Sequence, residues 1–158
     1  MKKKEVAVIM GSKSDMPVME YGIDILKKFG VGHEVKILSA HRTPAQTMKY
    51  ASQARAKGIK VIIAAAGGAA HLAGIIAAHT TLPVIGIPIE TKALAGIDSL
   101  FSTVQMPKGI PVGCMAIGKS GAINASLFAV EIIAVEDKKL QKKLDAHKKD
   151  MAKAVLKK

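Results

Sequence analysis

Residues 6–15 read VAVIMGSKSD, and this stretch decides the fold. Its five leading apolar residues have the pattern of a strand that is buried on both faces of a sheet. After the loop GSKSD, apolar side chains recur at helical spacing until Gly30 ends the pattern. Asp15 is placed to cap this helix, and Pro17 suits its first turn. A strand, a polar loop and a helix in this order predict the first unit of an α/β domain.

The same strand, loop and helix pattern repeats along the chain. Further strands are expected at residues 34–38, 61–65, 84–87 and 112–117, and helices at 44–57, 72–78, 96–104 and 122–135. Strands that alternate with helices of about 10–15 residues predict a parallel sheet with right-handed crossovers. The predicted fold class is therefore a three-layer α/β/α sandwich.

The last segment, residues 136–158, predicts a separate C-terminal extension helix after a complete domain at residues 1–135. Lysines cover most of this helix, and its narrow apolar face consists of Leu140, Leu144, His147, Met151 and Val155. We expect the helix to pack on a neighbouring subunit. Packing on its own domain is the alternative.

The formal net charge of +12 does not by itself indicate a nucleic-acid partner. Nine lysines lie within residues 134–158, and the only dense basic block elsewhere is Lys2–Lys4. Nucleic-acid binding favours a basic stripe with stacking aromatic residues, and aromatic residues make up only 3% of this chain. We interpret the charge as favouring solubility and the attraction of small anions.

Other classes of protein are also disfavoured. No apolar run approaches the roughly 18 residues of a membrane span, and the N-terminal residues lack the pattern of a signal peptide. The single cysteine, Cys114, allows no internal disulfide and lies in an apolar run, which favours a small buried side chain over a nucleophile. The spacing of His and Cys matches no metal site. We expect a soluble, cytoplasmic protein with no membrane partner.

Three unusual loops, at residues 11–15, 39–44 and 66–71, each follow a predicted strand and precede a predicted helix. Because ligands of open α/β sheets bind at the carboxyl ends of the strands, these loops should converge on one edge of the sheet. The first loop offers Gly11, Ser12, Ser14 and Asp15 at a helix N-terminus, where backbone N–H groups favour anions. A phosphate suits the serines, and Asp15 suits ribose hydroxyls. Turn residues and a helix cap are the alternative interpretation.

The second loop, SAHRTP, places Ser39, His41 and Arg42 together. Histidine titrates near neutral pH and is the commonest general acid or base. Arginine presents a fork of donors that matches a phosphate or a carboxylate. Taken alone, such a loop is more often a surface His-Arg pair that has no role.

The third loop is rich in small residues, which let a ligand approach the backbone closely. Its amides could hold a small planar anion or carbon dioxide, and its candidate site residues are Ala66, Gly67, Gly68, Ala69, His71 and Leu72. His71 is either a second titrating group or a residue that holds the loop. Together the three loops predict a pocket for a phosphorylated sugar with a small planar head beside a histidine. They do not name the reaction.

Six motifs then point to a family: GSKSD, SAHRTP, AGGAAHL, KALAGIDSL, QMPKGIPVG and AIGKSGAINA. In this order and spacing, over residues 6–133, the chain resembles the N5-carboxyaminoimidazole ribonucleotide mutases of purine biosynthesis. The resemblance implies a flavodoxin-like fold, a homo-octamer and no metal or organic cofactor. It also implies an isomerase that moves a carboxylate from the exocyclic N5 of an aminoimidazole ribonucleotide to ring carbon C4.

The resemblance also implies roles for the site residues. Ser12 and Arg42, with Ser39, would hold the 5′-phosphate, and Asp15 would bind the ribose hydroxyls. His41 would be the general acid and base. Carbon dioxide released from N5 would be trapped against residues 66–72 before C4 attacks it. The partners implied are this small-molecule ribonucleotide, further copies of the chain and, as a candidate, the upstream enzyme that makes the N5-carboxylated substrate.

Two alternatives stay open. A related branch carboxylates aminoimidazole ribonucleotide directly with carbon dioxide, and its third loop has no histidine after the alanines, whereas His71 is present here. A non-catalytic nucleotide-binding protein is the second alternative. The chain departs from the family pattern at Ala65, where glycine is expected, and at Ala73, where proline is expected.

Overall fold

The computed structural model describes residues 3–157, and within them five parallel strands form one sheet. The strand order is β2-β1-β3-β4-β5, the order of flavodoxin-like folds. The strand bounds are β1 Val6–Met10, β2 His33–Ile37, β3 Val61–Gly67, β4 Val84–Ile89 and β5 Gly113–Cys114. The chain reverses its direction of travel across the sheet between β1 and β3, which is where such folds bind their ligands.

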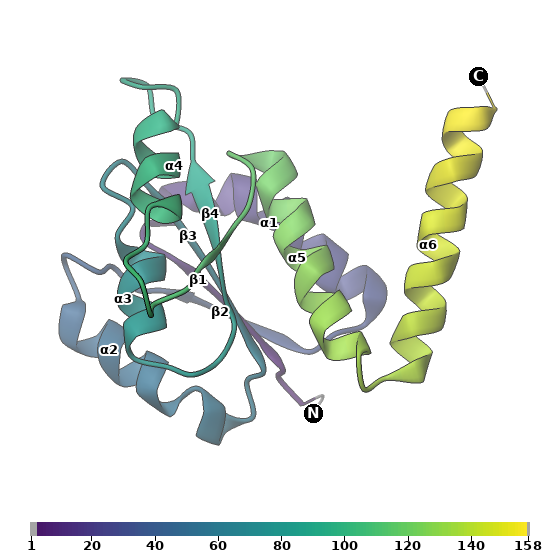
Figure 1. Cartoon of the computed structure of the whole chain (residues 1–158), viewed down its shortest axis with the longest axis horizontal. Helices are drawn as coiled ribbons and strands as arrows, with labels where there is room; N and C mark the ends of the chain where they lie inside the picture. Colours follow the sequence, from purple (N-terminus) through teal and green to yellow (C-terminus); the bar gives the residue numbers. More distant parts are fainter. Residues whose placement is uncertain (1–2, 158) are drawn as a thin grey trace.

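Helices cover both faces of the sheet (Figure 1). Their bounds are α1 Met16–Phe29, α2 Pro44–Gln53, α3 Leu72–Ala78, α4 Ile97–Val104, α5 Lys119–Ala134 and α6 Lys138–Leu156. Helices α1 and α5 pack on one face, and α2 and α3 pack on the other, in two separate apolar clusters. The predicted three-layer α/β/α sandwich is confirmed. No helix of residues 3–157 has both the length and the apolar character needed to cross a membrane.

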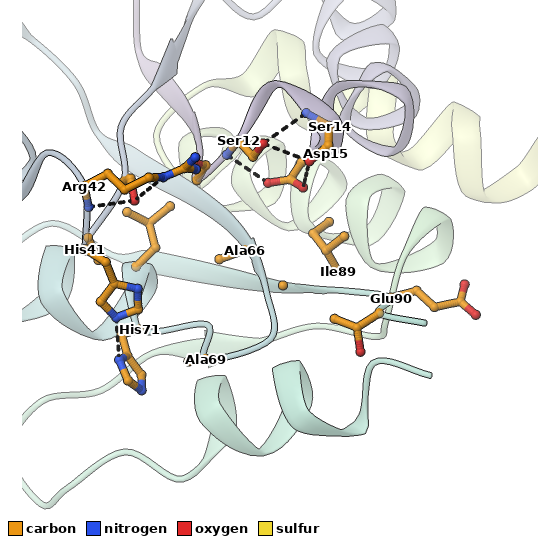
Figure 2. Close-up of a pocket in the computed structure, with 16 residues that line it drawn as sticks. Ser12, Ser14, Asp15, His41, Arg42, Ala66, Ala69, His71, Ile89 and Glu90 are labelled. Carbon is orange, nitrogen blue, oxygen red and sulfur yellow. Dashed lines mark hydrogen bonds between the residues drawn. The ribbon is translucent and has the colours of Figure 1, made fainter. Parts of the chain in front are cut away.

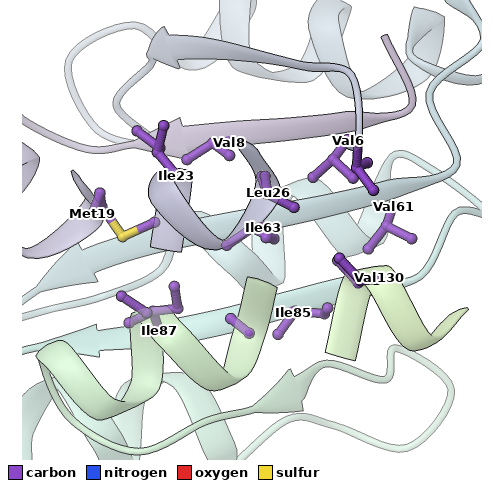
Figure 3. Packing of buried hydrophobic residues seen from close by; sticks show 14 of the residues in the cluster. Val6, Val8, Met19, Ile23, Leu26, Val61, Ile63, Ile85, Ile87 and Val130 are labelled. Atoms are coloured by element: carbon purple, nitrogen blue, oxygen red, sulfur yellow. The ribbon is translucent and has the colours of Figure 1, made fainter. Parts of the chain in front are cut away.

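Alternate side chains of the interior strand β1 pack into the two apolar clusters. Val6 and Val8 of β1 pack toward α1 and α5, whereas Ala7 and Ile9 pack toward α2 and α3. Figure 3 shows the first cluster, in which Val8 and Ile63 lie under α1. Full burial of a valine or isoleucine side chain contributes about 1.5–3 kcal/mol, so β1 is fixed firmly and the loop that follows it starts from a rigid base.

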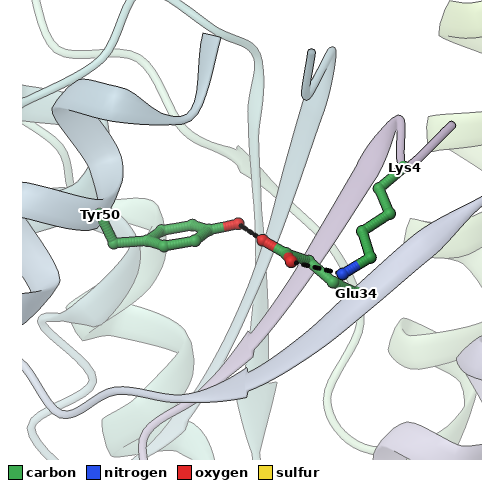
Figure 4. Close-up of polar contacts among 3 residues, drawn as sticks. All are labelled: Lys4, Glu34 and Tyr50. Atoms are coloured by element: carbon green, nitrogen blue, oxygen red, sulfur yellow. Dashed lines mark hydrogen bonds and ion pairs between the residues drawn. The ribbon is translucent and has the colours of Figure 1, made fainter. Parts of the chain in front are cut away.

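A polar contact ties the edge strand β2 to helix α2 (Figure 4). The Tyr50 hydroxyl donates a 2.6 Å hydrogen bond to Glu34, and Lys4 Nζ lies 3.2 Å from the other oxygen of the same carboxylate. Burial and the neighbouring carboxylate raise the pKa of Tyr50. Burial acts to raise the pKa of Glu34, but the bonds from Tyr50 and Lys4 hold it below its ordinary value. Tyr50 and Lys4 therefore both favour the ionised form of Glu34.

Two predicted elements near the sheet edges differ from the structure. The strand expected at residues 112–117 spans only Gly113–Cys114. The carbonyl of Pro88 in β4 accepts a hydrogen bond from the amide of Gly118, so the backbone of Pro88 faces the β5 side of the sheet. Proline has no N–H to donate on that side. The hydrogen-bond ladder between β4 and β5 therefore ends early. The helix expected at residues 44–57 ends at Gln53, and a 3₁₀ turn, Arg55–Lys57, follows it.

The first half of helix α6 packs on its own domain. Asp137 caps it through bonds from the amides of Lys139 and Leu140. Leu140 and Leu144 are buried in the same cluster as α1 and α5, and Lys143 Nζ donates to the carbonyl of Phe29 over 2.8 Å. The second half presents Met151 and Val155, which are 47% and 73% exposed. Packing of this half on a neighbouring subunit stays a prediction.

Candidate active site

The loops after β1, β2 and β3 line one cavity of about 430 Å³ at the carboxyl edge of the sheet (Figure 2). The predicted convergence of the three loops is confirmed. The predicted site residues that line this cavity are Gly11, Ser12, Ser14, Asp15, Ser39, His41, Arg42, Ala66, Gly67, Ala69, His71 and Leu72. Gly68 belongs to the third loop but does not line the cavity.

The first loop folds back on itself around Asp15. The amide of Ser12 donates to Asp15 Oδ2 over 3.1 Å, and the Ser14 hydroxyl lies 2.8 Å from Ser12 Oγ and 3.3 Å from Asp15 Oδ1. Asp15 occupies the N-cap position of helix α1, as predicted, but its carboxylate bonds to this loop rather than to an amide of the helix. The carboxylate is thereby held in place as a hydrogen-bond acceptor at the cavity.

Burial raises the pKa of Asp15, although the bonds from Ser12 and Ser14 and the positive charge of Arg42 act to lower it. Asp15 is only 6% exposed. An ionised carboxylate in such a place costs folding free energy unless a ligand supplies further donors. Ribose hydroxyls are donors of this kind.

The second loop brings Arg42 across to the first loop. Arg42 Nη2 donates to the carbonyl of Gly11 over 2.7 Å, and its backbone amide donates to Ser39 Oγ over 3.1 Å. Figure 2 shows the guanidinium pointing toward Ser12. A second cavity of about 430 Å³ continues on this side and adds Lys13 and Thr43 to the lining. Hydroxyls and cations thus gather at one end of the site, as a phosphate requires.

Two histidines meet at the other end of the cavity. His41 Nε2 lies 2.9 Å from His71 Nδ1, with the rings nearly perpendicular. This hydrogen bond needs a proton on one of the two facing nitrogens and a lone pair on the other. His71 precedes the first turn of α3, so the third loop places it against His41. The contact joins the candidate acid or base, His41, to the second histidine of the site.

A family model described as AIR carboxylase matches residues 5–154. The chain belongs to this family.

Individual members of the AIR carboxylase family are similar over nearly the whole chain. The N5-carboxyaminoimidazole ribonucleotide mutase of Bacillus subtilis is 54% identical over 151 residues, which cover 96% of this chain and 93% of that protein. The protein of the same name from Vibrio vulnificus is 52% identical over 152 residues, covering 96% and 94%.

Solved structures agree with this membership. The crystal structure of Treponema denticola PurE superposes with a TM-score of 0.88 at 26% identity, covering 98% of this chain and 95% of that one. A 3-dehydroquinate dehydratase-like protein from Bifidobacterium longum superposes at 0.53 with 12% identity, covering 85% and 99%, and shares the fold alone.

Sequence reasoning missed one wall of this AIR carboxylase family site. Ile89, Glu90 and Thr91, at and after the end of β4, line the cavity, as does Ala40 in the second loop. The signal was present in the sequence, because a polar pair directly follows a buried strand whose carboxyl end lies at the same edge as the other three.

Neither a metal centre nor a cysteine nucleophile is visible at this site. Among residues 3–157, no group of three or more His, Cys, Asp and Glu side chains is arranged to hold a metal ion. Cys114 lies on β5 and does not line the cavity. Burial raises the pKa of its thiol, which disfavours the nucleophilic thiolate.

Replacing Asp15 by asparagine should change how stability depends on pH. Because burial raises the pKa of Asp15 above 3.8, the folded chain binds a proton more readily than the unfolded chain. The stabilisation from this group is present in full below the unfolded-state pKa and is lost as pH rises through the folded-state pKa. We therefore expect the stability of Asp15→Asn relative to wild type to increase as pH rises through this window.

Urea titrations between about pH 3.5 and pH 7 measure this difference. Asp24→Asn is the matched control, because Asp24 lies on the exposed surface of α1 in an ion pair with Lys27. A difference between wild type and Asp15→Asn that stays constant across the range would contradict the prediction.

Proposed function

We propose that this protein is an N5-carboxyaminoimidazole ribonucleotide mutase, an isomerase of purine biosynthesis that converts N5-carboxyaminoimidazole ribonucleotide (N5-CAIR) to 4-carboxyaminoimidazole ribonucleotide (CAIR). One observation carries the proposal. Relatives that bear this name, from Bacillus subtilis and Vibrio vulnificus, are more than 50% identical over 96% of the chain. The cavity beside His41 has the groups that this chemistry needs.

The polar end of the cavity binds the ribose phosphate in this proposal. The Arg42 guanidinium and the Ser12 and Ser39 hydroxyls surround the 5′-phosphate, and the bond from Arg42 to Gly11 already holds the guanidinium in place. Asp15 accepts hydrogen bonds from the ribose hydroxyls. The aminoimidazole ring then extends toward His41 and His71.

His41 moves the protons of the reaction. When the bond between N5 and the carboxylate carbon breaks, carbon dioxide leaves, and the nitrogen takes a proton from His41. C4 then attacks the carbon dioxide, and His41 removes the C4 proton to restore the aromatic ring. Proton loss and gain balance over one turnover. His71, 2.9 Å away, orients the imidazole of His41 and can share its proton.

The third loop retains the carbon dioxide. Its small residues Ala66, Gly67 and Ala69 line the cavity, and Leu72 adds an apolar side chain. Because the gas stays within reach of C4, recombination is effectively intramolecular, and such an arrangement can contribute an effective concentration on the order of 10⁵ M or more.

An assay with two substrates tests the proposal. Purified protein is given either N5-CAIR, or aminoimidazole ribonucleotide (AIR) with bicarbonate, and CAIR formation is followed in both cases. We expect rapid conversion of N5-CAIR and far slower carboxylation of AIR. Equal rates would favour the direct carboxylase, and binding without turnover of either compound would favour the non-catalytic alternative.

The proposal includes assembly as a cytoplasmic homo-octamer, with the enzyme that makes N5-CAIR as a candidate partner. Exposed apolar side chains support assembly: Phe101 and Val104 on α4 are 57% and 47% exposed, and Val155 on α6 is 73% exposed. Such surface favours burial against another copy. Light scattering on the eluting protein gives the subunit number.

A further inference from the structure

The first turn of helix α4 lies behind two walls of the cavity and is bonded to both. Ser99 is completely buried, and its hydroxyl donates to the carbonyl of Ile89 over 2.6 Å and accepts from the amide of Gly68 over 2.8 Å. Ile89 ends β4, and Gly68 lies in the third loop. One hydroxyl therefore connects the wall after β4 to the wall after β3.

Neighbouring side chains of α4 strengthen this connection. Asp98 accepts from the Thr91 hydroxyl at 2.9 Å and 3.0 Å and from the amide of Ser99 at 2.9 Å. The Ser102 hydroxyl donates to the carbonyl of Asp98 over 2.7 Å and lies 3.3 Å from the carbonyl of Gly68. The N–H of Gly68 is thus bonded to one side chain of α4, and its C=O lies close to a second.

Packing does not determine the conformation of Gly68. Its φ is +68°, and a Cβ added there would meet no atom within 4 Å. The hydrogen bond that the Gly68 amide donates to Ser99 is therefore a main contact that fixes this peptide, together with the amide of Ala70, which donates to the Gly68 carbonyl over 2.8 Å. The backbone on either side of Gly68 carries Gly67 and Ala69, which line the cavity.

We infer that Ser99 is a positioning residue that holds the third loop closed over the carbon dioxide formed in the reaction. The inference rests on the proposed function. Without the hydroxyl, the Gly68 amide loses its acceptor and the loop relaxes away from the wall after β4. N5-CAIR still loses carbon dioxide and still takes a proton on nitrogen, giving AIR, but part of the carbon dioxide leaves before C4 attacks it.

Isotope exchange measures this loss of carbon dioxide from the site. Unlabelled N5-CAIR is converted in ¹³C-bicarbonate with carbonic anhydrase present, and the mass of the CAIR product shows whether its carboxyl carbon came from solution. We expect little label with wild type. Ser99→Ala should incorporate label and lower kcat on the order of 10–10²-fold, with KM unchanged, because misplacement of a reacting group by about 1 Å has effects of this size.

Thr103→Val is the matched control. Thr103 lies one turn further along α4, is 3% exposed, and donates its hydroxyl to the carbonyl of Ser99 over 2.8 Å. Within residues 3–157, no hydrogen bond joins its side chain to either loop. This variant, like Ser99→Ala, loses a buried hydroxyl of α4. An effect that comes only from lower stability should therefore lower the melting temperatures of both variants. We expect its label incorporation and kcat to match those of wild type. Ser102→Ala, which removes the bond to the Asp98 carbonyl together with the longer contact to Gly68, should give an intermediate incorporation of label.

Three outcomes would overturn the inference. Ser99→Ala could incorporate no more label than wild type, or Thr103→Val could incorporate as much label as Ser99→Ala. Wild-type protein that makes no CAIR from N5-CAIR would contradict the proposed function, and the inference with it. An active wild type together with a Ser99→Ala variant that incorporates no additional label would contradict only the inference.

Discussion

His41→Asn is expected to lower kcat for CAIR formation by about 10²–10⁴-fold while the affinity for CAIR stays close to that of wild type. The asparagine amide can form hydrogen bonds but cannot take up and release a proton near neutral pH. The side chain of His41 is exposed and contacts His71, so its replacement should leave the fold intact. Steady-state kinetics and calorimetric titration with CAIR measure the two quantities.

His79→Asn is the matched control for this substitution. His79 follows α3, bonds to the carbonyl of Ile75 over 2.9 Å and does not line the cavity. Its kcat should equal that of wild type. Retention of kcat within tenfold in His41→Asn would show that another group moves the proton, and His71 would be the next to test.

Arg42→Ala is expected to weaken binding of the phosphorylated nucleotide by about 10–150-fold, the range for losing a charge-assisted hydrogen bond worth about 1.5–3 kcal/mol. Affinity for the matching nucleoside, which lacks the phosphate, should not change. The affinity of Arg42→Lys for the nucleotide should lie between those of wild type and Arg42→Ala, because lysine keeps the charge but lacks the planar guanidinium. Binding is measured by calorimetry with nucleotide and nucleoside in parallel.

Arg55→Ala is the control for charge. Arg55 bonds to Thr81 and lines a different cavity from the candidate site, so its loss should leave affinity unaltered. An equal loss for nucleoside and nucleotide in Arg42→Ala would place Arg42 away from the phosphate.

The sequence predicted the site well where the physics is local. In a parallel sheet the carboxyl ends of neighbouring strands lie at one edge. The positions of Ser12, His41 and His71, each in a loop that follows a predicted strand, therefore predict that these residues lie close together. Existence and order of the main strands and helices were predicted for the same reason. Strong apolar periodicity leaves few alternatives for where a strand or helix lies.

The sequence did not predict features that depend on distant partners. Ser99 acts on Gly68, 31 positions away, and no local pattern connects a helical serine to a glycine loop. β5 ends early because the backbone of Pro88 in β4 faces β5. This orientation follows from the register of the two strands and not from the residues of β5. Asp15 fits the composition of a helix cap, and only the turn of residues 12–15 shows that its bonds go elsewhere.

The open space around Gly68 means that handedness, rather than size, restricts this position. A Cβ added here would meet no atom within 4 Å, yet an L-residue at φ +68° carries a penalty of about 1–2 kcal/mol. A D-residue would adopt the same backbone without that penalty. The loop is thus a place where the chirality of the backbone, and not the volume of the neighbours, keeps the residue a glycine.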